Sequence, residues 1–106
     1  MSESEPMPTV RDERQQQRFV FEKDGAGGEL AYEVDGDRLF LLHTEVVDAL
    51  RGQGVAGQLV TAAVSWAIDD GLTVVPWCPY ARRWLHEHPD VAGTVEVDWS
   101  TPRPNA

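Results

Sequence analysis

The chain has 106 residues, a length at which one domain can bury a core without disulfides or metal ions. Its 18 acidic residues against 9 basic ones give a net charge of −9, which argues against binding to nucleic acid or an anionic membrane, because both need clustered Lys and Arg. Cys78 is the single cysteine, so the sequence predicts no internal disulfide and favours a reducing, cytoplasmic compartment.

The first segment, residues 1–16, is polar and contains Pro6 and Pro8, which predicts a flexible leader. This segment lacks the basic region and the following apolar stretch of a signal peptide. No later apolar run approaches the roughly 20 residues that cross a membrane. We therefore expect no membrane partner and no nucleic-acid partner.

Three strands are expected next, in an antiparallel meander. The first begins at residues 19–21, and the second covers residues 29–34, where polar and apolar side chains alternate as in a half-buried strand. Residues 35–37, Asp-Gly-Asp, indicate a hairpin because glycine tolerates positive φ. The third strand, residues 38–46, is apolar through its first half, which predicts a central strand covered on both faces.

A helical period follows, over residues 53–70, and Gly71 is a suitable helix stop. Residues 72–77 predict a fourth strand, which a right-handed crossover would place parallel to the third. Pro79 suits the first turn of a second helix, and Pro89 would end it. The fold class is therefore α/β (α+β): a three-strand antiparallel meander, a helix, a parallel fourth strand and a second helix.

The last segments predict little regular structure. Residues 93–99 are expected to form a short final strand, and residues 100–106 a disordered tail. The folded domain would then span residues 17–99. No internal repeat is present in the sequence.

A glycine-rich turn at residues 51–57, Arg-Gly-Gln-Gly-Val-Ala-Gly, precedes the long helix. The first N–H groups of a helix have no internal partners, and with the helix dipole they form an anion site. Gly52 and Gly54 would let a phosphate approach the backbone without a Cβ in the way, and Gly57 would allow close helix packing. The alternative is a turn that holds no ligand.

Residues 52–57 also spell GxGxxG, the dinucleotide-binding fingerprint. That fingerprint follows its strand immediately, whereas residues 47–51 intervene here. An acidic residue is expected about 20 residues on, and residues 75–78 contain none. The context therefore disfavours a dinucleotide site.

Arg51, Gly54 and Ala56 together resemble the Q/R-x-x-G-x-G/A motif of the GNAT N-acetyltransferases, in the matching place between antiparallel strands and a parallel strand. His-Thr-Glu-Val at residues 43–46, Trp-Cys-Pro-Tyr at residues 77–80 and His-Pro at residues 88–89 extend the resemblance to a minimal GNAT-like family. The resemblance covers residues 19–90.

The resemblance implies acetyl-CoA as the cofactor, with the pyrophosphate on backbone N–H groups of residues 53–57 and the pantetheine arm beside residues 45–47. The implied cofactor-binding residues are Val46, Val47, Arg51, Gly52, Gln53, Gly54, Val55, Ala56 and Gly57. Val47 departs from the family pattern, where Pro is usual. The chain after the second helix is also shorter than in full-length GNAT enzymes, which leaves the acceptor pocket without its usual contributor.

Acetyl transfer to an amine needs a base, donors for the oxyanion and an acid for the leaving thiolate. Backbone N–H groups near Val46 are candidate donors. Cys78 precedes Pro79 at a helix N-terminus, where the dipole favours a thiolate. The resemblance implies that Cys78 could carry the acetyl group. The alternative is a buried, inert cysteine.

Three further residues are candidates for the chemistry. The resemblance implies Tyr80 as the acid, and a core aromatic is the alternative. His43 and Glu45 are two apart on one strand, so they share a face and could act as base and orienting partner. The alternatives are a core histidine and a glutamate that braces the glycine turn.

His86 and His88 with Cys78 do not make a metal site, because positions i and i+2 of a helix do not share a face.

Two functions stay open. The first is an N-acetyltransferase that acts on a small-molecule or peptide amine, directly or through Cys78. The second is a non-catalytic or partner-dependent acyl-CoA-binding module. A domain without a ligand, and a homodimer that completes the acceptor pocket, are further alternatives.

Overall fold

A single sheet organises the chain, whose computed structural model describes residues 10–23 and 25–104. Within this part the strands lie in chain order: β1 (Val10–Glu13), β2 (Arg18–Lys23), β3 (Ala26–Asp35), β4 (Arg38–Val46) and β5 (Thr73–Pro76). Strands β1 to β4 are antiparallel to their neighbours, and β5 is parallel to β4. The expected fold class, the meander and the parallel strand after the long helix are confirmed.

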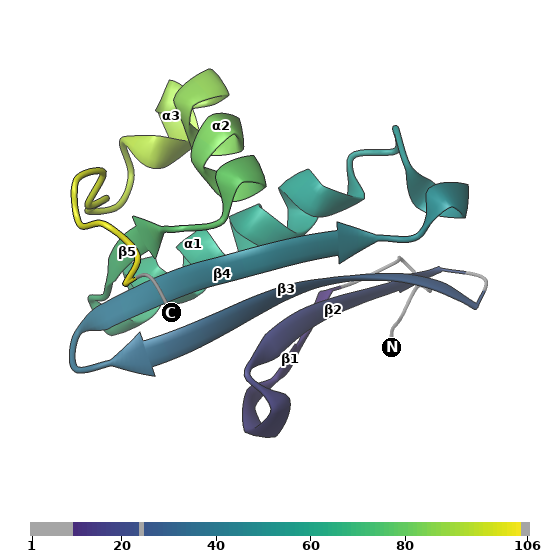
Figure 1. The fold of residues 1–106 in the computed structure, drawn as a ribbon, viewed down its shortest axis with the longest axis horizontal. Coiled ribbons are helices and arrows are strands. Elements are labelled where there is room, and N and C mark those ends of the chain that lie inside the picture. The colour runs from purple at the N-terminus through teal and green to yellow at the C-terminus, as the bar shows by residue number, and fades with distance from the viewer. Residues whose placement is uncertain (1–9, 24, 105–106) are drawn as a thin grey trace, which may run out of the picture.

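Helices connect and cover this sheet (Figure 1). They are η1 (Arg14–Gln16), η2 (Asp48–Leu50), α1 (Val55–Asp70), α2 (Pro79–Glu87) and α3 (Pro89–Ala92). Helix α1 starts two residues later than expected because Gly54 has φ of 77°, outside the helical region. Pro89 follows the end of α2, as expected, and also begins α3, which the sequence pattern did not indicate.

The core lies between one face of the sheet and helices α1 and α2. Leu59, Ala63 and Ala67 on α1 are fully buried against a cluster that includes Leu30 and Leu39 of the sheet. Burying each large aliphatic side chain contributes about 1.5–3 kcal/mol, so the α1 interface is a main source of stability. Leu50, in the connection between β4 and α1, belongs to the same buried cluster.

Strand β4 contains one extra residue, Leu42. Leu41 pairs with Tyr32, but His43 pairs with Ala31, so Leu42 has no partner across the ladder. Alternate residues of a strand face opposite sides, and an extra residue exchanges the two sets. Leu39 and Leu41 face the core before this β-bulge, whereas His43 and Glu45 are exposed after it.

The N-terminal boundary is a correction, because residues 10–16 form β1 and η1 and are not a flexible leader. Tertiary contacts order this polar segment. The Tyr32 hydroxyl donates to Asp12 Oδ1 at 2.6 Å, and the Arg14 guanidinium lies 4.0 Å above the Trp66 ring. The short strand has one aliphatic residue, Val10, so its pattern gave no strand signal. Residues 1–9 of the expected leader lie outside the described residues.

The C-terminal segment differs from expectation in two ways. Residues 93–99 make one isolated bridge, Val74 to Val97, instead of a strand. The expected disordered tail, residues 100–106, includes two residues that are held in place. The N–H groups of Ser100 and Thr101 both donate to Asp98 Oδ1. The Trp77 indole also donates to the Thr101 carbonyl at 2.9 Å. Residues 105–106 of that tail lie outside the described residues.

Candidate functional site

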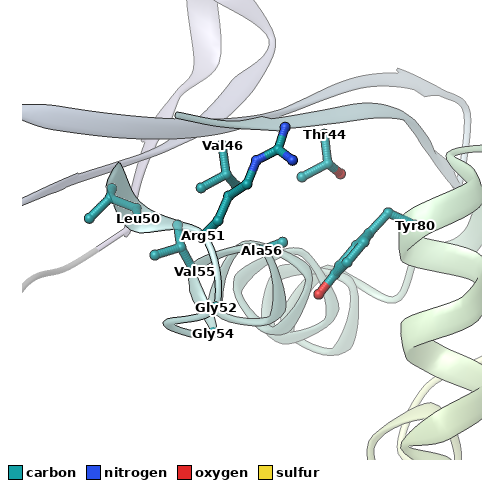
Figure 2. A pocket seen from close by; sticks show the side chains of 9 residues that line it. All are labelled: Thr44, Val46, Leu50, Arg51, Gly52, Gly54, Val55, Ala56 and Tyr80. Carbon is teal, nitrogen blue, oxygen red and sulfur yellow. The ribbon is translucent and has the colours of Figure 1, made fainter. Parts of the chain in front are cut away.

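A pocket of about 460 Å³ lies where β4 runs past the end of β5 (Figure 2). We call it the β4–α1 pocket. Strand β4, the glycine turn and the first turns of α1 and α2 enclose it. Its lining residues are Thr44, Val46, Leu50, Arg51, Gly52, Gly54, Val55, Ala56 and Tyr80.

The pocket exists because β4 and β5 separate. Their pairing ends at Leu41 and Pro76, after which the Cys78 N–H donates to the Leu41 carbonyl and the chain turns into α2. The Val47 N–H donates to Gly27 in β3, so by strand alternation the backbone groups of Thr44 and Val46 point away from β3. The edge of β4 beside the pocket therefore offers backbone donors and acceptors to a ligand.

The glycine turn closes one end of the pocket. Gly52 and Gly54 have φ of 80° and 77°, and a Cβ on either would meet no atom within 4 Å. The first intrahelical bond of α1 runs from the Gln58 N–H to the Gly54 carbonyl, so the N–H groups of residues 55–57 precede it. Free N–H groups, the positive end of the dipole and open space together fit a phosphate group.

The charge of the lining fits the same ligand class. The β4–α1 pocket has no carboxylate among its lining residues, although the chain carries 18 acidic residues. Its charged residue is Arg51, whose Nε lies 3.1 Å from Asp48 Oδ1. Both side chains of this pair are exposed, so it contributes little and leaves Arg51 able to move to a ligand.

Six of the nine expected cofactor residues line the pocket: Val46, Arg51, Gly52, Gly54, Val55 and Ala56. The other three do not. Val47 is exposed and lines a shallow cavity on the opposite face of the sheet. Gln53 turns back, since its N–H donates to Leu50 and its side-chain amide to Ala49. Gly57 packs beneath Trp84.

Thr44 and Leu50 line the pocket but were not among the residues expected there. Strand alternation could have identified Thr44, because Thr44 is two residues from Val46 and therefore shares its face of the strand. Leu50 lies in η2 and is buried, and no sequence pattern marks it.

Cys78 lies next to the pocket but does not line it. The side chain is 2 % exposed and caps α2, where Sγ accepts a long hydrogen bond of 3.5 Å from the Ala81 N–H. Thr44, which lines the pocket, places its Oγ1 3.2 Å from the same sulfur. The thiol is therefore held on two sides, with Thr44 on the side of the pocket.

The other three candidates lie on two sides of β4. Tyr80 projects from the first turn of α2 into the pocket, with its hydroxyl directed toward α1 (Figure 2). His43 and Glu45 share a face, and that face is the opposite one. His43 Nε2 lies 4.0 Å from Glu29 Oε2, and Glu45 lines the shallow cavity there together with Arg18 and Glu29. Glu29, not Glu45, is thus the carboxylate next to His43.

The histidines of α2 have aromatic partners. The ring of His86 stacks on Trp99, and that of His88 on Trp84, each with centroids 4.0 Å apart. Within residues 10–23 and 25–104, no three His, Cys, Asp or Glu side chains gather as a metal site would require. In the same part of the chain, no helix has the length and apolar character needed to span a membrane.

Comparison with known proteins agrees with the expected family and fold. A family model described as GCN5-related N-acetyl-transferase matches residues 18–94. Protein NATD1 of Mus musculus is 35% identical over 83 residues, which cover 76% of each chain, and that of Homo sapiens is 34% identical, covering 76% of this chain and 74% of the relative.

A solution structure gives the same architecture. It is that of a GCN5-like protein from Staphylococcus aureus, with a TM-score of 0.67, 22% identity and coverage of 95% of this chain and all of the other. At this identity the likeness concerns the fold. The family match and the similarity to NATD1 concern the sequence itself, and the chain belongs to the GCN5-related N-acetyltransferase family.

Proposed function

We propose that this protein transfers an acetyl group from acetyl-CoA to an amine, and that acetyl-CoA binds in the β4–α1 pocket. One observation carries the proposal. A pocket without carboxylates joins the open edge of β4 to the free N–H groups of α1, within a strongly acidic chain. A long ligand that is anionic at one end and rich in amides along its arm matches both parts.

Different residues of the pocket would bind different parts of acetyl-CoA. The turn at Gly52 and Gly54, with the N–H groups that follow, would hold the pyrophosphate. The backbone groups of Thr44 and the Val46 carbonyl would pair with the amides of the pantetheine arm, as a neighbouring strand would. Leu50 would supply an apolar wall.

Acetyl-CoA supplies an acetyl group activated as a thioester. The Val46 N–H would donate to the thioester carbonyl oxygen and stabilise the negative charge that develops there. The amine nitrogen forms a bond to the carbonyl carbon as the carbon–sulfur bond breaks. Tyr80, whose hydroxyl lies in the pocket, would give its proton to the departing thiolate.

The amine would approach from the opposite face of β4, where His43 and Glu45 are exposed. His43 would take the proton that the amine loses, and its Nε2 lies 4.0 Å from Glu29 Oε2. The net charge of −9 attracts cationic small molecules or peptide amines to this surface.

We propose direct transfer instead of a route through acetyl-Cys78. The thiol is buried, caps α2 and contacts Thr44, so an acetyl group on sulfur would need space that the packing does not leave. The second candidate function, an acyl-CoA-binding module without turnover, needs the same pocket but none of the reacting side chains.

Two measurements test the proposal in sequence. Calorimetric titration with acetyl-CoA, and with NAD as control, should give micromolar binding of acetyl-CoA alone. Release of free CoA thiol in the presence of a mixed set of amines should then detect turnover. Binding without turnover by any amine would favour the binding module, and the absence of acetyl-CoA binding by folded protein would overturn both functions.

A further inference from the structure

Charged side chains of opposite sign alternate across the face of the sheet that lies opposite α1 and α2. Arg11 of β1 has its Nη1 2.9 Å from Glu22 Oε1 of β2 and its Nη2 3.0 Å from Glu13 Oε2. Arg18 of β2 joins Glu13 to Glu29 of β3, with Nη2 2.8 Å from Glu13 Oε1 and Nη1 2.9 Å from Glu29 Oε1. The network therefore runs from β1 through β2 and ends at Glu29 on β3.

Arg18 is the central member of this network. Its Nε donates to Glu13 Oε1 at 2.8 Å while its Nη1 donates to Glu29 Oε1, so one planar guanidinium is held on two edges. Val20, the register partner of Glu29, lies on the same face and is nevertheless only 9% exposed. An isolated surface ion pair contributes little, whereas several charges in one network over a buried residue restrict one another. Arg18 thus fixes the position of the Glu29 carboxylate.

The carboxylate of Glu29 connects this network to His43 of β4. Glu29 Oε1 takes part in the pair with Arg18, whereas Oε2 lies 4.0 Å from His43 Nε2. A small rotation of the half-exposed His43 side chain would bring that distance into the range of a hydrogen bond. The Nε2–H group would then donate to Glu29, which leaves Nδ1 as the nitrogen that can accept a proton.

We propose that Arg18 and Glu29 are positioning residues for acetyl transfer, an inference that rests on the proposed function. Arg18 holds Glu29, and Glu29 holds the imidazole of His43 with Nδ1 free to face the amine. As the amine nitrogen bonds to the thioester carbon and the carbon–sulfur bond breaks, the proton of the amine passes to Nδ1. A base that is held in one orientation loses less of its reactivity to unproductive positions.

The proposal also gives β1 a role. Glu13, at the end of β1, anchors Arg18, and the Tyr32 hydroxyl holds β1 in turn through Asp12 Oδ1 at 2.6 Å. Val10 is the single aliphatic residue of this strand, so β1 adds little to the hydrophobic core. Its carboxylates instead order the guanidinium that positions Glu29.

The first test measures kcat and KM for the amine, by release of CoA thiol from the full chain. Glu29→Gln should lower kcat by about fivefold and leave the Kd for acetyl-CoA unchanged, because the carboxylate that orients His43 is lost. Glu22→Gln is the matched control, since it removes the same charge from the same shallow cavity, where Glu22 pairs with Arg11. The control should keep the wild-type kcat. Equal losses of kcat would reduce the effect to net charge and overturn the inference.

A double-mutant cycle separates positioning from a general loss of structure. Arg18→Gln alone should lower kcat by about threefold. If Arg18 and Glu29 act through His43, neither Arg18→Gln nor Glu29→Gln should lower kcat further in a His43→Gln background. A further loss of similar size in that background would show a structural effect and overturn the inference.

A spectroscopic measurement needs no amine. Arg18→Gln and Glu29→Gln should both shift the imidazole ¹⁵N resonances of His43, whereas Glu22→Gln should not. Resonances that neither Arg18→Gln nor Glu29→Gln shifts would overturn the inference.

The outcomes distinguish this inference from the proposed function. A wild type that turns over, with kcat insensitive to Glu29→Gln, would overturn the inference and spare the proposed function. A folded wild type that does not bind acetyl-CoA would overturn both.

Discussion

The two faces of β4 beyond Leu42 differ in charge. The pocket face presents Thr44 and Val46 to a space without carboxylates. The opposite face, which we call the charged face, carries His43 and Glu45 beside Arg18, whose Nη1 lies 2.9 Å from Glu29 Oε1. One strand thus separates a surface suited to an anionic ligand from one suited to a cationic ligand, over the thickness of a single sheet.

The difference follows from one inserted residue. Without the bulge at Leu42, continued alternation from Leu39 and Leu41 would turn His43 and Glu45 toward α1 and the turn. They would then face the β4–α1 pocket, where a carboxylate would repel the proposed anionic ligand. The bulge therefore allows the apolar core and the charged residues to occupy the same strand.

The largest effect is expected from Gly54→Glu. The change places a carboxylate at the turn and a side chain at φ of 77°, so the Kd for acetyl-CoA should rise by about 1,000-fold. Gly36→Glu is the matched control, since Gly36 has φ of 64° and open space but lies in the hairpin between β3 and β4. Calorimetry should show normal binding by the control. Equal losses would mean that the turn does not hold the phosphates.

Tyr80→Phe tests the pocket face for chemistry. Removal of the hydroxyl should lower kcat for thiol release by about 100-fold, because no acid remains for the leaving thiolate. The Kd for acetyl-CoA should stay the same, since the ring that lines the pocket is retained. An unchanged kcat would leave Tyr80 as a packing residue.

His43→Gln tests the charged face. At neutral pH the change should lower kcat/KM for the amine by about tenfold, with acetyl-CoA affinity unchanged because His43 lies across the strand from the pocket. The defect should diminish at higher pH, where the amine loses its proton unaided. A loss of acetyl-CoA affinity would show instead that the two faces are not independent.

Cys78→Ser should have a small effect on rate. Serine keeps a cap acceptor for α2, so we expect turnover within about threefold of wild type, whereas Cys78→Ala should lose about 1 kcal/mol of stability with the cap. Kinetics and thermal unfolding measure the two. An acetyl adduct on Cys78 in the intact mass, together with an inactive but stable Cys78→Ser, would establish the covalent route.

The smallest effect concerns Asp98, far from either face of the site. The Thr101 hydroxyl, followed by Arg38, holds the pKa of this carboxyl well below its usual range. Because the folded pKa is lowered, the stabilisation is present above the unfolded pKa of about 4 and is lost as pH falls below it. Thermal melts should place Asp98→Asn below wild type at pH 7, with a gap that begins to narrow as the pH falls below about 4 and closes only near the lowered folded pKa. A constant gap would exclude this linkage.

Local patterns in the sequence identified most elements of the fold. Alternation located β3, the helical period located α1, and Pro79 marked the start of α2. They missed β1, because its order comes from Tyr32 and Trp66, which are distant in sequence. They also placed a strand at residues 93–99, where only one bridge forms.

The sequence alone determined the glycine turn and the fact that His43 and Glu45 share one face of β4, because positive φ and strand alternation depend on a few adjacent residues. Tertiary structure decided which side of the sheet that face occupies, because the bulge at Leu42 is defined only by the register with β3. It also decided the burial of Cys78 and the packing of Trp84 over Gly57. Those features arise where separate elements pack together, and no local pattern encodes that contact.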